Sequence, residues 1–251
     1  MDQNKLSFLA HHTHRFASPV SEALLDRAIA IADPKPGAVA FDLGCGTGNM
    51  ALHLAERWGL QVKAVDRSPL MIDEAAGRLE GRGAPGTVEL HRAGSIDFLA
   101  REGEADLVVA IGAVALTAGD QNAGAVLQAL ARNVRPGGCL LWGETNWKRE
   151  PSDMLRLLLG PTVSTYASHT EYVRAGEAVD LLPLYAATSS EQEWDEYTFR
   201  YTTALENHLR DNPDDPDGAE IRNRAQGWRA LYLQEGRDTM GFGLYLFRKP
   251  G

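Results

Sequence analysis

A glycine-rich turn follows a short apolar stretch near the start of the chain, and the residues around it could bind a small charged ligand. Residues 39–43 read as a strand, every second residue from 44 to 48 is glycine, and apolar side chains recur at helical spacing over 50–58. Glycines let a ligand approach bare backbone. A dinucleotide fingerprint would need glycine where Asn49 stands, and Asp42 would repel a pyrophosphate. The turn therefore predicts a site for a cationic or zwitterionic ligand.

A second acid, Asp66, ends the next predicted strand, over residues 60–66. It follows Asp42 at close to one strand–helix–strand repeat, the spacing that places an acid on a ribose. The two oxygens of one carboxylate match the two hydroxyls of a ribose. We therefore expect Asp66 to bind a sugar at the same edge of the sheet as the glycine turn.

The elements that must position these residues alternate along the chain. Strands are predicted over 39–43, 60–66, 87–92, 105–112, 139–144, 184–188 and 240–248, and helices over 69–79, 121–134, 168–180, 191–210 and 219–234. Strands that alternate with helices at this spacing indicate an α/β fold with a doubly wound, mostly parallel, seven-stranded sheet.

One domain of this type accounts for the whole chain, 1–251. Residues 1–35 are predicted to form an N-terminal arm with a lid-like helix outside the sheet, which begins at Ser18–Pro19. The core is expected to span 36–189, a helical cap is inserted over 190–236, and 237–251 supply the final strand.

The composition narrows the function class. The apolar fraction of 44% and the charged fraction of 24% are ordinary for a soluble protein, and the net charge of −9 argues against a phosphate-binding groove for nucleic acid. No apolar run approaches a membrane span, and Cys45 and Cys139 lack metal-ligand spacing. We therefore expect a cytoplasmic protein with no metal, whose His11, His12 and His14 lie at the surface or along a pocket. The oligomeric state is not readable from the sequence.

Five spaced motifs together resemble those of the class I S-adenosylmethionine-dependent methyltransferases. They are the turn at 42–48, the acid-closed strand at 65–71, Gly-Ser-Ile-Asp at 94–97, Ala-Asp-Leu-Val at 105–108 and Arg-Pro-Gly-Gly at 135–138. The resemblance covers most of the chain. It implies a Rossmann-like sheet and an enzyme that transfers the methyl group of S-adenosylmethionine and releases S-adenosylhomocysteine.

The resemblance also implies residue roles. Asp42 with the Gly44 and Gly46 backbone would hold the methionine end of the cofactor, and Asp66 the ribose. Arg67 and Met71 would flank the adenine, with Ser95 and Ile96 at its edge and Ile111 on the far wall. The remaining cofactor-binding residues that it implies are Cys45, Asn49 and Gly94. Ser95 replaces the usual carboxylate for the adenine amino group, so that either Asp97 or backbone groups would accept this hydrogen bond.

Methyl transfer needs a general base only if the acceptor must lose a proton. The candidates are Glu144 at the end of the fifth strand, His14 and Tyr172; Glu144 is best placed, because ligands meet α/β sheets at the carboxyl ends of strands. The stretch 111–116 is small and apolar, unlike the motif of nucleic-acid amino methyltransferases. With the predicted cap, this favours a small-molecule acceptor with O-, N-, S- or C-methylation open; the alternatives are a protein or RNA acceptor and a non-catalytic module.

Overall fold

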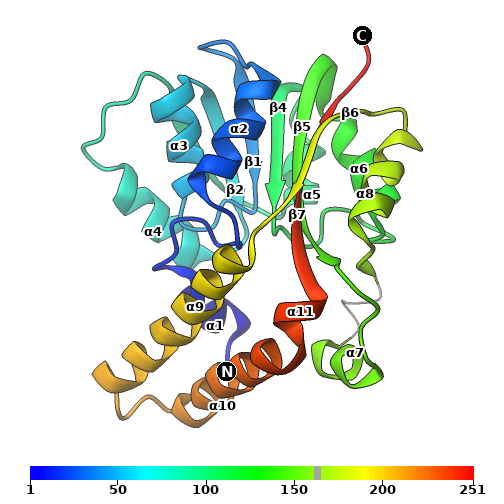
Figure 1. Ribbon diagram of the computed structural model, residues 1–251. Coiled ribbons are helices and arrows are strands. Elements are labelled where there is room, and N and C mark those ends of the chain that lie inside the picture. The colour runs from blue at the N-terminus through cyan, green and yellow to red at the C-terminus, as the bar shows by residue number, and fades with distance from the viewer. Residues whose placement is uncertain (161–164) are drawn as a thin grey trace.

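The computed structural model describes residues 1–160 and 165–251. Its centre is a seven-stranded sheet in the order β3-β2-β1-β4-β5-β7-β6 (Figure 1). The strands are β1 (Val39–Leu43), β2 (Gln61–Asp66), β3 (Thr87–Arg92), β4 (Ala105–Ile111), β5 (Val134–Trp147), β6 (Leu182–Thr188) and β7 (Met240–Arg248). All neighbouring pairs from β3 to β5 are parallel, whereas β7 runs antiparallel between β5 and β6. The predicted α/β fold with a mostly parallel seven-stranded sheet is confirmed.

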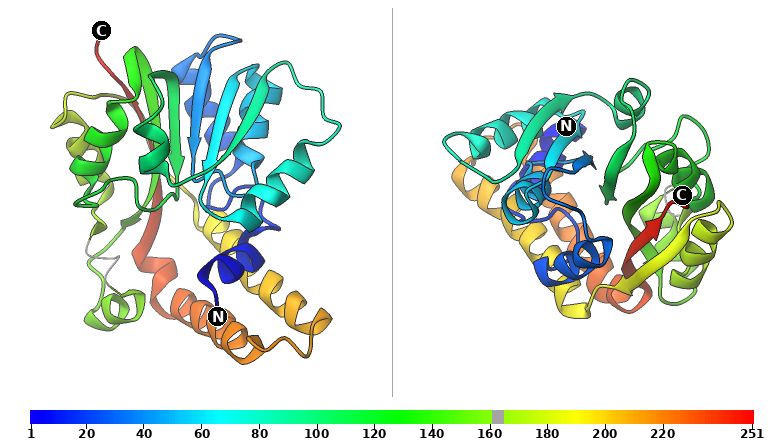
Figure 2. Two further views of the ribbon diagram at one scale, coloured as in Figure 1. Left: turned by 180° about the vertical axis from the view of Figure 1, so that it is seen from behind. Right: turned by 90° about the horizontal axis from the view of Figure 1, so that it is seen from above.

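Helices cover both faces of this sheet (Figure 2). The helices of the core are α2 (Glu22–Ala32), α3 (Asn49–Trp58), α4 (Pro69–Leu79), α5 (Ser95–Leu99), α6 (Ala123–Ala131) and α8 (His169–Glu177). Side chains of α2 and α3 pack on one face against buried residues such as Leu107 and Leu141. Those of α5, α6 and α8 pack on the other, against Phe41 and Leu140. β1, β4 and β5 are thereby enclosed from both sides, which explains their continuous apolar runs.

The N-terminal region differs from the predicted lid. Its helix α2 begins after Ser21, which caps it, and not at Ser18–Pro19. Leu25, Ala28 and Ile29 are fully buried in the core, because the apolar stripe of α2 faces the sheet. A separate helix, α1 (Gln3–His11), was not predicted and is the part that lies beyond the sheet edge (Figure 1).

A helical layer lies beyond the carboxyl ends of the parallel strands (Figure 1). It consists of α1, α9 (Glu191–Asp211), α10 (Gly218–Leu231), the π-helix η2 (Tyr232–Gly236) and α11 (Arg237–Thr239); α7 (Asp153–Leu159) follows β5 nearby. Leu6 and Leu9 of α1 join a small core with Leu205 of α9 and Ile221 of α10. We call α1, α9 and α10 the cap.

An ion-pair cluster fixes the end of the cap. The Lys5 Nζ lies 2.8 Å from Asp215 Oδ1 and 2.7 Å from Asp217 Oδ2 in the turn between α9 and α10. In the same turn, Asp215 Oδ2 lies 2.7 Å from His208 Nε2 of α9. The N-terminal helix is therefore held to the cap by charge as well as by apolar contact. In the ranges 1–160 and 165–251, no helix has the length and apolar character needed to cross a bilayer.

Candidate functional site

The glycine turn has a backbone that side chains would disturb. Gly44, Gly46 and Gly48 have φ values of 69°, 53° and 77°, in the left-handed region that favours glycine. A Cβ on Gly44 would also lie 2.9 Å from the Ala113 Cβ. The Gly44 and Cys45 amides both donate to the Val65 carbonyl, at 2.9 and 3.0 Å, which ties the turn to the end of β2. The turn is thus held with bare backbone at the carboxyl edge of the sheet.

Asp66 joins this turn to the next helix. Its Oδ2 accepts from the Gly46 amide at 3.0 Å, and its Oδ1 accepts from the Ser68 amide at 2.8 Å. A carboxylate offers about four lone-pair positions, so two further hydrogen bonds remain open to it. Asp66 is half-buried, with its carboxylate fixed at the end of its strand.

Asp42 is the buried acid below the turn. The backbone amide of Ala51 hydrogen-bonds to it, whereas its Oδ2 finds no hydrogen-bond partner among the residues that the structure describes. Burial, and then the nearby Asp66 charge, raise the pKa of Asp42 to about 7. An acid in this state would be stabilised as a carboxylate by a positive charge brought to the turn.

A cavity of about 780 Å³ opens beside the turn and extends to the cap. The glycine-turn side of its wall consists of Gly44, Gly46, Asp66, Arg67, Ser68, Met71, Gly94, Ser95, Ile96, Asp97 and residues 112–116. The cap side includes His11, Glu144, Thr145, Tyr166, Trp194, Tyr197, Trp228, Met240 and Phe242. Residues from all parts of the chain therefore meet in one hollow at the carboxyl edge of the sheet.

The structure brings most of the expected cofactor residues to this wall, but not all of them. Gly44, Gly46, Asp66, Arg67, Met71, Gly94, Ser95 and Ile96 line the cavity. Asp42, Cys45, Asn49 and Ile111 are not among the described residues that line it. Cys45 is buried, and the Asn49 side-chain amide donates to the His14 carbonyl at 3.1 Å, so that it secures the N-terminal segment to the turn.

Glu144 lies where β5 continues beyond its neighbour. The pairing of β4 with β5 ends at Ile111 and Gly143, so Glu144 is the next residue past the carboxyl edge. Its side chain is half-buried on the cavity wall and accepts from the Thr145 amide at 2.8 Å. Burial raises the pKa of this carboxyl group to about 7. It can therefore gain and lose a proton near neutral pH.

The other two predicted bases are engaged in structural contacts. The Tyr172 hydroxyl donates to the Thr145 carbonyl at 2.8 Å and accepts from the Ala167 amide at 3.1 Å. His14 Nε2 lies 3.1 Å from the Tyr197 carbonyl, and burial lowers the pKa of His14 to about 4. Neither is among the described residues that line the cavity. These contacts stabilise the segments around the cavity and do not bring either side chain to a bound ligand.

Two cap residues on this wall were not predicted as functional, His11 and Tyr197. His11 Nδ1 lies 2.9 Å from the Ser7 carbonyl, and His11 Nε2 lies 3.1 Å from the Tyr197 hydroxyl. They are distant in the sequence, and Tyr197 reads as one more aromatic residue of an amphipathic helix. No sequence pattern could have joined them.

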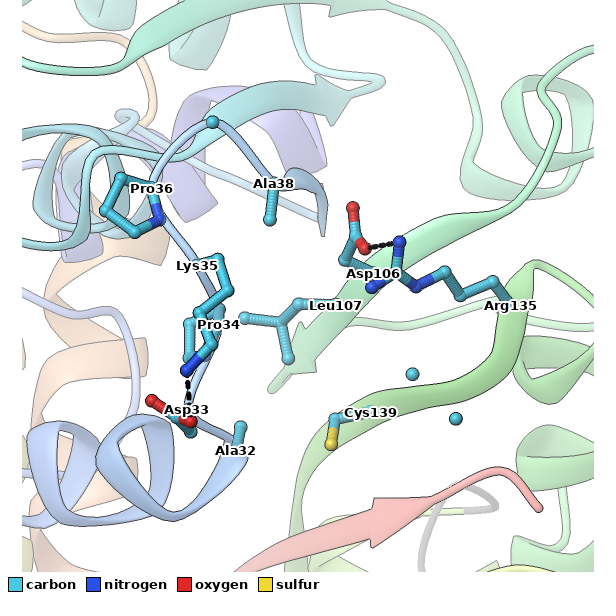
Figure 3. A pocket seen from close by; sticks show the side chains of 13 residues that line it. Ala32, Asp33, Pro34, Lys35, Pro36, Ala38, Asp106, Leu107, Arg135 and Cys139 are labelled. Atoms are coloured by element: carbon cyan, nitrogen blue, oxygen red, sulfur yellow. Dashed lines mark hydrogen bonds and ion pairs between the residues drawn. The ribbon is translucent and has the colours of Figure 1, made fainter. Parts of the chain in front are cut away.

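A second cavity, of about 430 Å³, lies at the amino edge of the same sheet (Figure 3). Lys35 and Arg135 line it, and each is paired: Lys35 Nζ is 2.5 Å from Asp33 Oδ2, and Arg135 contacts Asp106. Asp106 also accepts from the Val39 amide at 2.8 Å. The charged side chains of this second cavity named above are therefore paired with one another.

Known proteins resemble this chain in sequence. Residues 40–138 match a methyltransferase domain family. The chain is 26% identical over 250 residues to the uncharacterized protein YjhP of Escherichia coli, with 98% of each chain covered.

Two solved structures share the fold across almost their full length. One is a SAM-dependent methyltransferase from Geobacter sulfurreducens in complex with S-adenosylhomocysteine, with TM-score 0.87, 23% identity, and 97% of each chain covered. The other is a SAM-dependent methyltransferase from Thiobacillus denitrificans with the same ligand, with TM-score 0.86 and 22% identity, covering 98% of this chain and 99% of that one. The predicted resemblance to class I methyltransferases is confirmed.

Proposed function

We propose that this chain is a class I S-adenosylmethionine-dependent methyltransferase whose methyl acceptor is a small molecule. The observation that carries the proposal is the cap, since one cavity continues from the glycine turn to a wall of cap side chains. A pocket closed over by helices suits a ligand that enters it whole better than a segment of a macromolecule. The net charge of −9 and the buried free thiols of Cys45 and Cys139 support a cytoplasmic enzyme that does not bind nucleic acid.

The chemistry of the turn fits S-adenosylmethionine. We assign its methionine end to the backbone of Gly44 and Gly46, where the absence of a Cβ leaves room, with the unpartnered Asp42 oxygen behind them favouring positive charge. We assign the ribose hydroxyls to the open lone pairs of Asp66. When bound, the sulfonium supplies an electrophilic methyl group.

The adenine end is assigned to the neighbouring wall. Arg67 and Met71 would flank the ring, with Ser95 and Ile96 at its edge. Ser95 has no carboxylate to accept a hydrogen bond from the adenine amino group. Asp97 lines the same part of the cavity, so we assign this hydrogen bond to its carboxylate. One such neutral hydrogen bond is worth about 1 kcal/mol, so the exchange leaves binding in place.

The chain's own work is then alignment and shielding. The cap holds the acceptor in line with the methyl group and excludes water from the pair. Glu144 lies on the cavity wall just past the carboxyl edge of the sheet, and we assign to it the proton of acceptors that must lose one.

The test is transfer of label from methyl-tritiated S-adenosylmethionine into a cell extract, which is then separated into small molecules, protein and nucleic acid. We expect enzyme-dependent label among the small molecules. Label in protein or RNA would overturn the acceptor class, and binding of the cofactor without any transfer would point to a non-catalytic module. A Gly46→Val variant, whose side chain would enter the cofactor part of the cavity, serves as the blank.

A further inference from the structure

We propose that the acceptor is an apolar amine whose nitrogen meets Glu144 and Tyr197. The inference rests on the proposed function and names the substrate class of the same site. Three features of the cap side of the cavity carry it, namely its aromatic wall, its charge and its hydrogen-bonding character.

Five aromatic side chains contribute to the wall on the cap side. Trp194 and Tyr197 come from α9, Trp228 from α10, Phe242 from β7, and Tyr166 from the loop before α8. Such a wall buries a ring or hydrocarbon body, and its ring faces also attract a cationic ammonium group. The body of the ligand is therefore expected to be apolar.

The charge of the wall selects against acidic ligands. Glu144 supplies the carboxylate of the cap side, and Asp66 and Asp97 lie on the cofactor side. Among the lining residues that the structure describes, Arg67 is the single lysine or arginine, and it is exposed beside Asp66. A carboxylate or phosphate ligand would thus face Glu144 with no cation to pair with. An ammonium group would find its counter-charge there.

The pairing of His11 with Tyr197 leaves a hydrogen-bond acceptor on the cap side. A carbonyl can only accept, so the proton of neutral His11 lies on Nδ1, toward Ser7. Nε2 is then a lone pair, and the Tyr197 hydroxyl donates to it. Burial lowers the pKa of His11, which keeps the ring neutral. The Tyr197 oxygen is left with lone pairs for an N–H donor.

Glu144 and Tyr197 line the same cavity. Tyr166 lines it as well and interacts electrostatically with each of them. Two hydrogen-bond acceptors in one cavity suit the three or two N–H groups of a protonated primary or secondary amine. A carbonyl or carboxylate ligand would leave both unpaired.

The reaction balances with these groups alone. The bound ammonium gives a proton to the Glu144 carboxylate, and the freed nitrogen lone pair forms a bond to the methyl carbon. The electron pair of the carbon–sulfur bond stays on sulfur, which becomes a neutral thioether. The nitrogen carries the positive charge as a methylated ammonium, and Glu144 later releases its proton to water.

The test is binding to the protein saturated with S-adenosylhomocysteine, measured by calorimetry with three probes of one shape: naphthylethylamine, naphthylpropanoate and naphthylethanol. We expect the amine to bind at least about tenfold more tightly than the acid and the alcohol. Glu144→Gln should remove this preference. Tyr197→Phe should weaken amine binding about threefold, because one neutral hydrogen bond is lost.

Glu80→Gln is the matched control, since Glu80 is exposed at the end of α4. Equal or tighter binding of the acid or alcohol, no binding of the amine, or an unchanged preference in Glu144→Gln would overturn the amine assignment. Saturation with S-adenosylhomocysteine is measured first in the same cell. Its failure would count against the proposed function itself, and so the two failures are distinguishable.

Discussion

The sheet has a cavity at each of its two edges, and the two differ in how their charges are satisfied. At the amino edge, Lys35 and Arg135 each pair with an acid beside them (Figure 3). The Asp106 carboxylate also accepts a hydrogen bond from the Val39 amide. At the carboxyl edge, Glu144 bonds its own backbone neighbour, and Asp66 retains unused lone pairs. The charges of Lys35, Arg135 and Asp106 at the amino edge are paired within the protein. The carboxylates at the carboxyl edge keep hydrogen-bonding capacity and negative charge for a ligand.

The difference follows from the topology. At the amino ends of the parallel strands the connections are short, and charged residues there can form ion pairs with near neighbours. Their carboxyl ends feed loops that diverge to opposite faces, which leaves polar groups facing a shared space. The two cavities are therefore distinguished by whether their charged groups are paired, which their volumes do not reveal.

The strongest test of this contrast is Asp66→Ala. We expect S-adenosylhomocysteine to bind about a thousandfold more weakly, because two charge-assisted hydrogen bonds and the anchor of the Gly46 amide are lost together. Calorimetric titration measures the effect, with the exposed Asp73→Ala on α4 as the control. Unchanged affinity in Asp66→Ala would break the assignment of the cofactor to this edge.

Glu144→Gln should have the next largest effect. The turnover rate is expected to fall about a hundredfold at neutral pH, the usual loss on removing a general base. The wild-type rate should rise with pH through about 7 as the Glu144 carboxyl group loses its proton, and the variant should lack this rise. The titratable groups that face it, Tyr166, Tyr172 and Tyr245, have pKa values raised above the ordinary tyrosine range. A pH profile that survives in the variant would assign the base elsewhere.

Asp42→Asn tests the buried acid by stability. The pKa of Asp42 is raised from 3.8 to about 7 in the folded chain, so folded protein holds a proton there that unfolded protein has lost. The free energy of unfolding of the wild type should therefore fall as pH rises through this window, by on the order of 4 kcal/mol. The variant should lose that dependence. Urea unfolding at about pH 4 and about pH 8 measures the slope, and identical slopes for the two proteins would contradict the shift.

Arg135→Ala should have the smallest effect. Its guanidinium group is largely exposed where it meets Asp106, so the pair is expected to contribute less than about 1 kcal/mol to the free energy of unfolding. Cofactor affinity and turnover should be unchanged, as shown by the same titration and label assay. A loss of turnover in this variant would mean that the amino edge also takes part in function.

Much of the fold was predictable from the sequence, and so was the position of the glycine turn and Asp66, because both rest on local patterns. The glycine turn, Asp66 and the stretch at 94–97 are contiguous motifs, and the structure places the turn and Asp66 at one edge of the sheet. The lid-like role of α2 was wrong. An amphipathic stripe shows that a helix is buried, but not which surface buries it, and here the sheet does.

The cap side was much less predictable. His11 and Tyr197 are brought together by the packing of α1 on α9, which no local pattern encodes. Glu144 was predictable because it follows from strand position alone. Tyr172 lies in a helix that begins with the predicted capping box, but its hydroxyl binds the Thr145 carbonyl and the Ala167 amide. Long-range packing, rather than residue type, decides which polar groups remain available to a ligand.

The place of β7 in the sheet also sets an order of assembly. β6 pairs with β7, and β7 in turn joins it to β5, so β6 has no partner in the sheet until β7 has been synthesised. The cap helices α9 and α10 lie between these two strands in the sequence and leave the ribosome before β7. Met240 and Phe242 of β7 are part of the cavity wall. During synthesis, the glycine-turn side of the cavity can therefore form early from adjacent segments, whereas the cap side is completed only by the last strand to emerge.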